Sequence, residues 1–159
     1  ISVTTLIFIF VFIFRIVGIS GRSMENTLHN EDRVVITSLF YTPAQGDIVV
    51  INQPNEFNEP IIKRIIALEN QTVDINFETG EVSVDGVILE EPYISTPTTV
   101  SEGITFPVTV PEGKVFVLGD NRQNSTDSRS EMIGMIDTRY ILGKAVFRIF
   151  PFDKIGMLS

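Results

Sequence analysis

The stretch "PIIKRIIAL", residues 60–68, is an apolar run in which isoleucines flank one lysine and one arginine. Short β-branched runs bounded by Pro, Gly, Asn or Asp are typical of strands, so this stretch predicts a strand over 61–68. Successive side chains of a strand point to opposite faces, and Lys63 and Arg64 are therefore expected to point apart. The stretch thus predicts a lysine set among apolar side chains, away from the neighbouring guanidinium.

Similar runs occur along most of the chain and predict further strands. Asp85-Gly86 supplies the positive φ values that a two-residue hairpin turn needs. Residues 90–107 are rich in Thr, Ser, Glu and Pro, which predicts an irregular excursion from the core. A short helix over 130–135 is also expected, although its glycine disfavours it. The other predicted strands are 14–19, 33–37, 47–52, 72–76, 82–84, 87–89, 108–110, 114–118 and 141–150.

Together these elements predict an all-β fold. We expect a small, mainly antiparallel, partly closed sheet core with an inserted β-ribbon at about residues 76–111. The chain has 159 residues, enough for one modest domain with a core of its own. That domain is expected to occupy residues 18–159.

The first residues, "ISVTTLIFIFVFIF", carry no charge and precede Arg15. Fourteen helical residues span roughly 21 Å, short of the roughly 30 Å hydrocarbon core of a bilayer. We therefore expect residues 1–17 to be an incomplete part of a transmembrane helix that anchors the domain. A cleaved signal peptide and a buried strand rich in Ile and Phe are the alternatives.

The composition excludes several classes of function. Lys and Arg number 12 against 20 Asp and Glu, a net charge of -8, which opposes binding to nucleic acid. The chain has no cysteine, which excludes disulfides, thiolate metal sites and a cysteine nucleophile. It has one histidine, His29. We expect neither a metal nor a cofactor.

Nucleophilic catalysis would therefore rest on Ser or Thr, activated by a group other than the usual histidine of a triad. Lowering a lysine pKa from about 10.4 to about 8 costs roughly 3 kcal/mol, which burial among apolar groups can provide. Lys63 has that setting, although a lysine that extends along apolar surface into water is the simpler interpretation. Ser23, in "SGRSMENTL" at residues 20–28, is either a linker residue or a nucleophile.

A third stretch, "GDNRQNSTDSR" at residues 119–129, is densely polar and follows an apolar strand. Its carboxylates could form bidentate pairs, Asp120 with Arg64 and Asp127 with Arg129. Ser125 could orient a lysine amine. A solvated surface loop is the alternative.

In this order, these stretches resemble the type I signal peptidases, the membrane-bound Ser/Lys endopeptidases of bacteria. The family pattern is an apolar anchor followed by a serine box, a "GDIVV" box at 46–50, a "KR" box at 63–64 and the "GDNRxxSxDSR" box at 119–129. The stretch "VSVDGVILEEPYI" at 82–94 is similar to the family's ribbon. The resemblance covers nearly the whole chain.

The resemblance implies roles for individual residues. Ser23 is expected to be the nucleophile, Lys63 the general base and Ser125 the residue that orients Lys63. Met24 is expected to form a wall of the substrate cleft, and Gly21 stands where some relatives place a serine hydroxyl as a second oxyanion donor. The residues that are expected to form an ionic frame are Arg64, Asp120, Asp127 and Arg129.

Two positions depart from the family pattern, and the single histidine needs an interpretation of its own. Asn26 stands where the family usually has proline, so the turn after the nucleophile lacks a fixed φ. Asn70 replaces a glycine and is expected to adopt a positive φ. His29 lies in a polar turn and is expected at the surface.

The resemblance also implies the activity. It is an endopeptidase that removes N-terminal signal peptides from exported preproteins, cutting after small residues at the outer face of the cell membrane. Its expected partners are preproteins and membrane lipid, with a single-pass anchor and no nucleic acid. Two alternatives remain: a self-cleaving Ser/Lys peptidase of the repressor type, and an assembly factor for surface polymers such as pili, expected to lack the Ser or the Lys.

Overall fold

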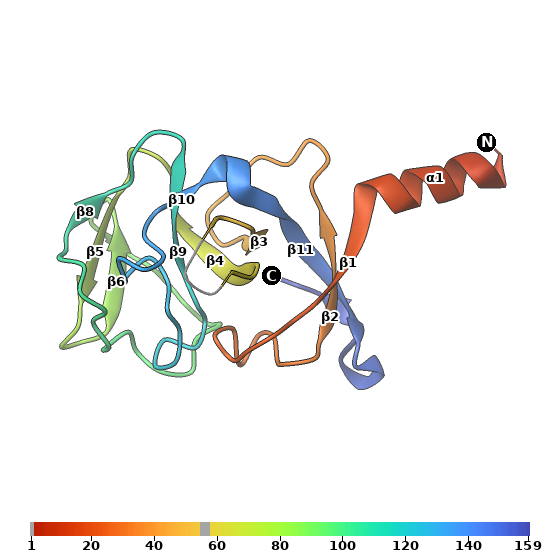
Figure 1. Cartoon of the computed structure of the whole chain (residues 1–159). Coiled ribbons are helices and arrows are strands. Elements are labelled where there is room, and N and C mark those ends of the chain that lie inside the picture. Colours follow the sequence, from red (N-terminus) through yellow and green to blue (C-terminus); the bar gives the residue numbers. More distant parts are fainter. Residues whose placement is uncertain (1, 55–57) are drawn as a thin grey trace.

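The computed structural model describes residues 2–54 and 58–159, apart from the side chains of residues 8, 9, 11 and 12. Strands dominate, and the larger sheet curls around the interior (Figure 1). The prediction of a mainly antiparallel β fold is confirmed. In chain order the elements are α1 (Val3–Ile13), β1 (Phe14–Gly18), β2 (Arg33–Thr37), β3 (Ile48–Ile51), β4 (Ile61–Ala67), β5 (Thr72–Asn76), β6 (Glu81–Val84), β7 (Val87–Ile88), β8 (Val108–Thr109), β9 (Lys114–Leu118), β10 (Ile136–Asp137), η1 (Thr138–Tyr140), β11 (Ile141–Phe150), η2 (Phe152–Lys154) and β12 (Gly156–Met157).

The larger sheet has the strand order β1-β2-β11-β3-β4-β9-β10, with β12 paired to β11, and its pairs are antiparallel. Strand β11 joins the two halves because it pairs with both β2 and β3. Its register shifts within both pairings, and such bulges increase the local twist of a sheet. The sheet therefore curls far enough to bring β1 near the start of β4.

Strand β4 lies at the centre of the core, and six of its seven residues are buried. Ile62, Ile65 and Ile66 belong to three separate clusters of apolar side chains. A strand covered on both faces has a continuous apolar sequence rather than an alternating one, which explains the pattern of this stretch. Lys63 is carried into the interior by the same strand.

The inserted part forms a second sheet with the order β7-β6-β5-β8. It begins at Thr72, earlier than the predicted boundary at 76. Asp85 and Gly86 both have positive φ, 50° and 79°, at the turn that joins β6 and β7, so the predicted hairpin is confirmed. Asn70 has φ 65°, so its predicted positive φ is confirmed.

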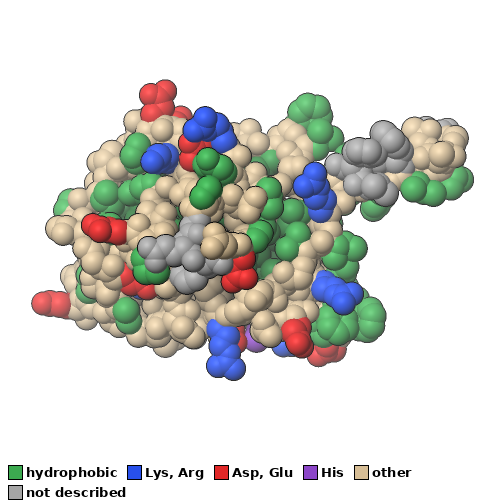
Figure 2. Space-filling view, viewed as in Figure 1, with side chains coloured by type: hydrophobic (Ala, Val, Ile, Leu, Met, Phe, Trp, Pro, Cys, Tyr) green, Lys and Arg blue, Asp and Glu red, His purple; other side chains and the backbone are tan. Residues whose placement is uncertain are grey.

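The N-terminal segment differs from the predicted anchor over 1–17. Helix α1 ends at Ile13, and the next residues form β1, which confirms the predicted strand over 14–19 and in which Phe14 pairs with Thr37 of β2. The helix ends there because the backbone groups that follow bond to β2. Within the described residues, no helix is long and apolar enough to cross a membrane. The helix stands out from the body of the molecule, and Figure 2 shows apolar side chains along it.

The predicted helix over 130–135 is wrong. Ser130 forms a β-bridge with Gly103, and a single turn follows in which Gly134 N donates to Ser130 O at 2.8 Å. Gly134 has φ 63°, a left-handed conformation that ends the turn instead of continuing a helix. The two-residue strands β10 and β12 were not predicted, because so short a run carries no periodicity.

Candidate active site

Ser23 and Lys63 are brought together by the fold. Lys63 Nζ lies 2.7 Å from Ser23 Oγ, a hydrogen-bond distance, although the residues are 40 positions apart. Ser23 is half-buried in the turns that follow β1, and Lys63 is 4% exposed in β4. Asn121 N donates to Ser23 O at 2.9 Å, which holds the serine against the loop after β9. The two residues that the sequence singled out for catalysis are in direct contact.

The environment of Lys63 favours the neutral amine. Burial lowers its pKa from 10.5 to about 8. Nearby Asp127, Glu102 and Asp120 raise this pKa and Arg129 lowers it further, but the desolvation of the ammonium has the largest effect. A lysine with this pKa is mostly neutral only above about pH 8, and in that state it can accept a proton from a hydroxyl.

The predicted ion pairs are present, and both are bidentate. Arg64 donates from Nε and Nη2 to Asp120 at 2.9 and 2.8 Å. Arg129 donates from Nε and Nη2 to Asp127 at 2.9 and 3.0 Å. All four side chains are at most 1% exposed. Thr27 Oγ1 also donates to Asp120, so the first pair connects the serine turn with β4 and the loop after β9.

Ser125, predicted to orient Lys63, forms a hydrogen bond with Asp127 in this network. Its Oγ donates to Asp127 Oδ2 at 2.8 Å, and Gly119 N donates to the same oxygen at 3.0 Å. A carboxylate two residues away is a strong acceptor, which explains why the hydroxyl points to it. In this structure Ser125 orients Asp127, whose charge in turn acts on Lys63.

Gly119 is required by close packing at this point. A Cβ there would lie 2.2 Å from Ser125 Oγ and 2.4 Å from Ser23 O. Real Cβ atoms essentially never come so close to other atoms, so a larger residue would push the serine turn or Ser125 aside. The glycine therefore sets the distance between the loop and the serine turn.

Met24 and Gly21 were predicted to contact substrate. Met24 is instead 1% exposed and packs in a core cluster with Leu28 and Ile62, so it forms no open wall of a cleft. The reason is that the turn after Ser23 folds inward onto the sheet. Gly21 is exposed with φ 89°, and its N–H donates to Asn30 Oδ1 at 3.0 Å.

His29, predicted at the surface, is half-buried. Its backbone N–H donates to Asp32 Oδ2 at 3.0 Å. Its Nδ1 has no hydrogen-bond partner within the part of the chain that the structure describes.

Two residues of the network were missed, Arg122 and Glu91. Arg122 is fully buried, donates from Nε to Gly119 O at 2.9 Å, and forms an ion pair with Glu91. Tyr93 donates to Glu91 as well, and its ring stacks on the Arg64 guanidinium at 3.9 Å. The arginine of the "GDNR" stretch was the available signal, but its partner lies 31 positions away.

A cleft of about 220 Å³ lies beside the segments that carry Ser23 and Lys63, although neither residue lines it. It lies between β1 and the beginning of β4, where Ile61–Lys63 pair with β3 and pairing with β9 begins at Arg64. Ser20 and Ile62 connect it to the serine turn and to the lysine strand. The residues lining it are Val17, Gly18, Ile19, Ser20, Val50, Glu59, Pro60, Ile61 and Ile62.

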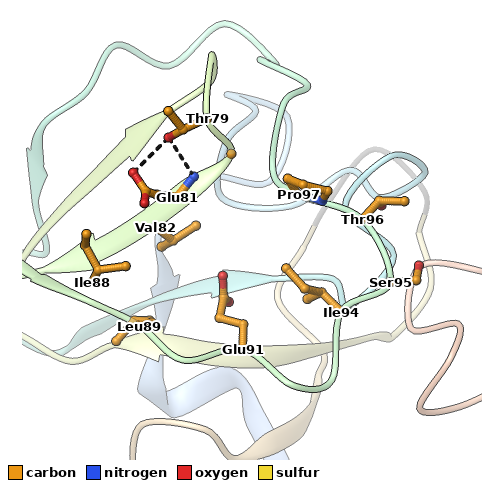
Figure 3. A pocket seen from close by; sticks show the side chains of 11 residues that line it. Thr79, Glu81, Val82, Ile88, Leu89, Glu91, Ile94, Ser95, Thr96 and Pro97 are labelled. Carbon is orange, nitrogen blue, oxygen red and sulfur yellow. Dashed lines mark hydrogen bonds between the residues drawn. The ribbon is translucent and has the colours of Figure 1, made fainter.

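Another hollow, of about 320 Å³, adjoins the second sheet. It lies between the Thr79–Glu81 turn and the residues around Ile94, with the Glu91 side chain at its edge (Figure 3). Neither Ser23 nor Lys63 lines it. Among the described residues, no three His, Asp or Glu side chains are grouped so that they could hold a metal ion.

A serine in contact with a buried lysine on an antiparallel β fold defines a class of serine hydrolase that uses an amine as its base. The sequence profile of the family described as "Signal peptidase, peptidase S26" matches residues 1–150. The chain belongs to this family of serine endopeptidases.

Individual relatives agree with the family. The chain is 39% identical over 151 residues to the probable signal peptidase I-1 of Synechocystis, covering 89% of this chain and 74% of the relative. It is 37% identical over 165 residues to signal peptidase I of Bacillus licheniformis, covering 98% and 87%. The crystal structure of a signal peptidase I from Enterococcus faecalis is similar with a TM-score of 0.52 and 31% identity, covering 65% of this chain and 97% of that one.

Proposed function

We propose that this chain removes N-terminal signal peptides from exported preproteins, with Ser23 as the nucleophile and Lys63 as the general base. The observation that carries the proposal is the 2.7 Å contact between Ser23 Oγ and a buried lysine amine. Its support is the low pKa of Lys63, about 8, which leaves the amine free to take the hydroxyl proton.

The reaction follows from this pair. Ser23 Oγ attacks the scissile carbonyl while Lys63 accepts its proton, and the resulting ammonium then protonates the leaving amine. The acyl-enzyme ester is next attacked by a water molecule that Lys63 deprotonates. The Ser23 N–H is proposed as one donor to the oxyanion. The two buried ion pairs hold the serine turn, β4 and the loop after β9 in register for these steps.

The cleft suits an extended peptide. It lies between β1 and the beginning of β4, where a substrate segment can pair with strand backbone as an added strand. Its lining is mostly apolar, which suits the apolar side chains of a substrate segment. The preference for small residues before the cleaved bond is proposed from the resemblance to the family.

Membrane lipid is proposed as the second partner, with the catalytic domain on the extracytoplasmic face of the cell membrane. The support is a set of exposed apolar side chains on α1, on β1 and on the turn between β11 and β12. Ile16 is 65% exposed and Phe152 79% exposed. A substrate whose own apolar segment lies in the bilayer would then reach the cleft along the membrane surface.

The assembly-factor alternative is less well supported. Its expected mark is the loss of the serine or the lysine, whereas both are present and in contact. The repressor-type alternative normally has a DNA-binding domain, and the chain's charge of -8 opposes binding to DNA.

Cleavage of a preprotein tests the proposed function directly. The purified chain, in detergent or lipid, is incubated with a preprotein that has alanine at the first and third positions before its cleavage site. We expect one cut after the first-position alanine, read by mass spectrometry. Phenylalanine at that position is expected to lower kcat/KM by about a hundredfold or more, because the proposed activity cuts after small residues. Cleavage at scattered sites, or equal rates for both substrates, would contradict the proposal.

The pH dependence tests the state of Lys63. Because the neutral amine is the base and its pKa is about 8, kcat/KM should rise with pH and level off above that value. At pH 6 it should be lower than the plateau by about a hundredfold. A rate that does not change between pH 6 and pH 9 would exclude a titrating lysine base.

A further inference from the structure

The excursion between β7 and β8 is tied to the loop that follows β9. Arg129 Nη1 donates to Val100 O at 2.8 Å, and Ile104 N donates to Arg129 O at 3.1 Å. These two hydrogen bonds lie on either side of Glu102 in the sequence. They hold the backbone of the excursion on both sides of Glu102, so the Glu102 side chain is attached to a fixed part of the chain.

The Glu102 carboxylate lies beside the catalytic machinery. Its Oε2 accepts a hydrogen bond from Asp127 N at 3.3 Å, and the side chain is half-buried. It also interacts electrostatically with Lys63. The charged groups that face Lys63 are Asp120, Asp127 and Arg129 from the loop after β9, and Glu102 from the excursion.

We propose that Glu102 is a positioning residue of the reaction, whose carboxylate supplies a further negative charge to the Lys63 amine beside those of Asp127 and Asp120. This inference rests on the proposed role of Lys63 as the base. Asp127 is bound by Arg129, whereas Glu102 comes from a separate segment of the chain and is partly open to solvent. Glu102 therefore adjusts the proton affinity of the amine while the buried ion pairs hold the geometry.

The electrostatics of Glu102 agree with this role. Burial raises its pKa, Asp127 raises it further, and Arg129, the Asp127 N–H and Lys63 lower it. The ionised carboxylate stabilises the ammonium form of Lys63 and so raises the pKa of Lys63. Removing that charge must therefore lower the pH at which Lys63 becomes neutral.

Glu102→Gln isolates the charge, because the amide oxygen can still accept the hydrogen bond from Asp127 N. We expect the acidic limb of the pH profile of kcat/KM to move to lower pH by about half a unit, a small shift because a partly exposed carboxylate is screened. Relative to the plateau, kcat/KM at pH 6.5 should then rise about threefold. The matched control is Glu78→Gln, which removes an exposed carboxylate in the turn of the second sheet and should leave the profile unchanged.

A second measurement separates this proposal from the proposed function. The pKa of Lys63 is followed by NMR in protein that contains 13C-labelled lysine, with no substrate present, in wild type and in Glu102→Gln. A lower midpoint in the variant supports the proposal whether or not a given preprotein is cleaved. Identical midpoints and identical pH profiles would overturn it. If Glu102→Ala then lowered the rate equally at every pH, the role of Glu102 would be purely structural. Failure of wild type to cleave any preprotein would count against the proposed function alone.

Discussion

Replacement of Lys63 by methionine is expected to reduce kcat/KM by about a thousandfold or more while the protein stays folded. Methionine is similar in length and apolar, so it suits a site in which only 4% of the residue is exposed. It cannot accept the Ser23 proton, and the loss of a general base that also activates water removes most of the catalysis. The measurement is single-turnover cleavage of a preprotein, with circular dichroism to confirm the fold.

The design of this experiment includes a control and a test of coupling. Lys114→Met alters a partly exposed lysine at the start of β9, outside the site, and should leave cleavage at the wild-type rate. Ser23→Ala should be as inactive as Lys63→Met, and the double variant no worse than either, because residues that act as one unit are strongly non-additive. Near wild-type cleavage by the Lys63 variant at any pH would refute the proposed pair.

Replacement of Arg129 by methionine is expected to cause a large loss of stability. The change leaves the Asp127 carboxylate, which is 0% exposed, without its bidentate partner. Breaking a buried pair from one side costs about 3–5 kcal/mol, because an uncompensated charge stays in the interior. For a chain of this size that loss corresponds to a fall in Tm of roughly 10 °C. Thermal unfolding of the variant and of the wild type measures this difference.

The chain contains a matched control for this pair. Arg139 binds Asp137 with the same two-residue spacing and the same pair of donors, Nε and Nη2, but its side chain is 83% exposed. Surface pairs contribute little, so Arg139→Met should leave Tm almost unchanged. Equal effects of the two substitutions would show that burial does not determine the strength of the Asp127–Arg129 pair.

Much of the fold could be predicted from the sequence because its strands are local patterns. The run around Lys63 is β-branched and long enough to have one interpretation, and Asp85-Gly86 specifies its hairpin through backbone sterics alone. The boundary at Ile13 agrees with the predicted strand over 14–19 but not with the predicted anchor over 1–17, and the sequence left these two predictions overlapping. An apolar run has no periodicity that separates helix from strand, and the pairing with β2 decides where the helix ends.

The candidate site was predicted only in part, because some of its residues belong to local motifs whereas its contacts depend on the fold. Ser23 and Lys63 were identified by residue type and by order along the chain. The Arg122–Glu91 pair and the burial of Met24 depend on which segments meet in space, and neither follows from a short motif. The hydrogen bond from Ser125 Oγ to Asp127 Oδ2 likewise depends on how the loop after β9 folds, which the short motif does not specify.

The separation in sequence of the contacting residues has a consequence for how the enzyme is made. Contacts in the site join positions 40, 56 and 93 residues apart. Long chain loops must close before such contacts form, and topologies of this kind fold slowly. The loop after β9 must also be synthesised before the serine turn has its support. A chain that lacks the loop after β9 also lacks the support of the serine turn, so we expect no proteolysis before that loop has been synthesised and folded.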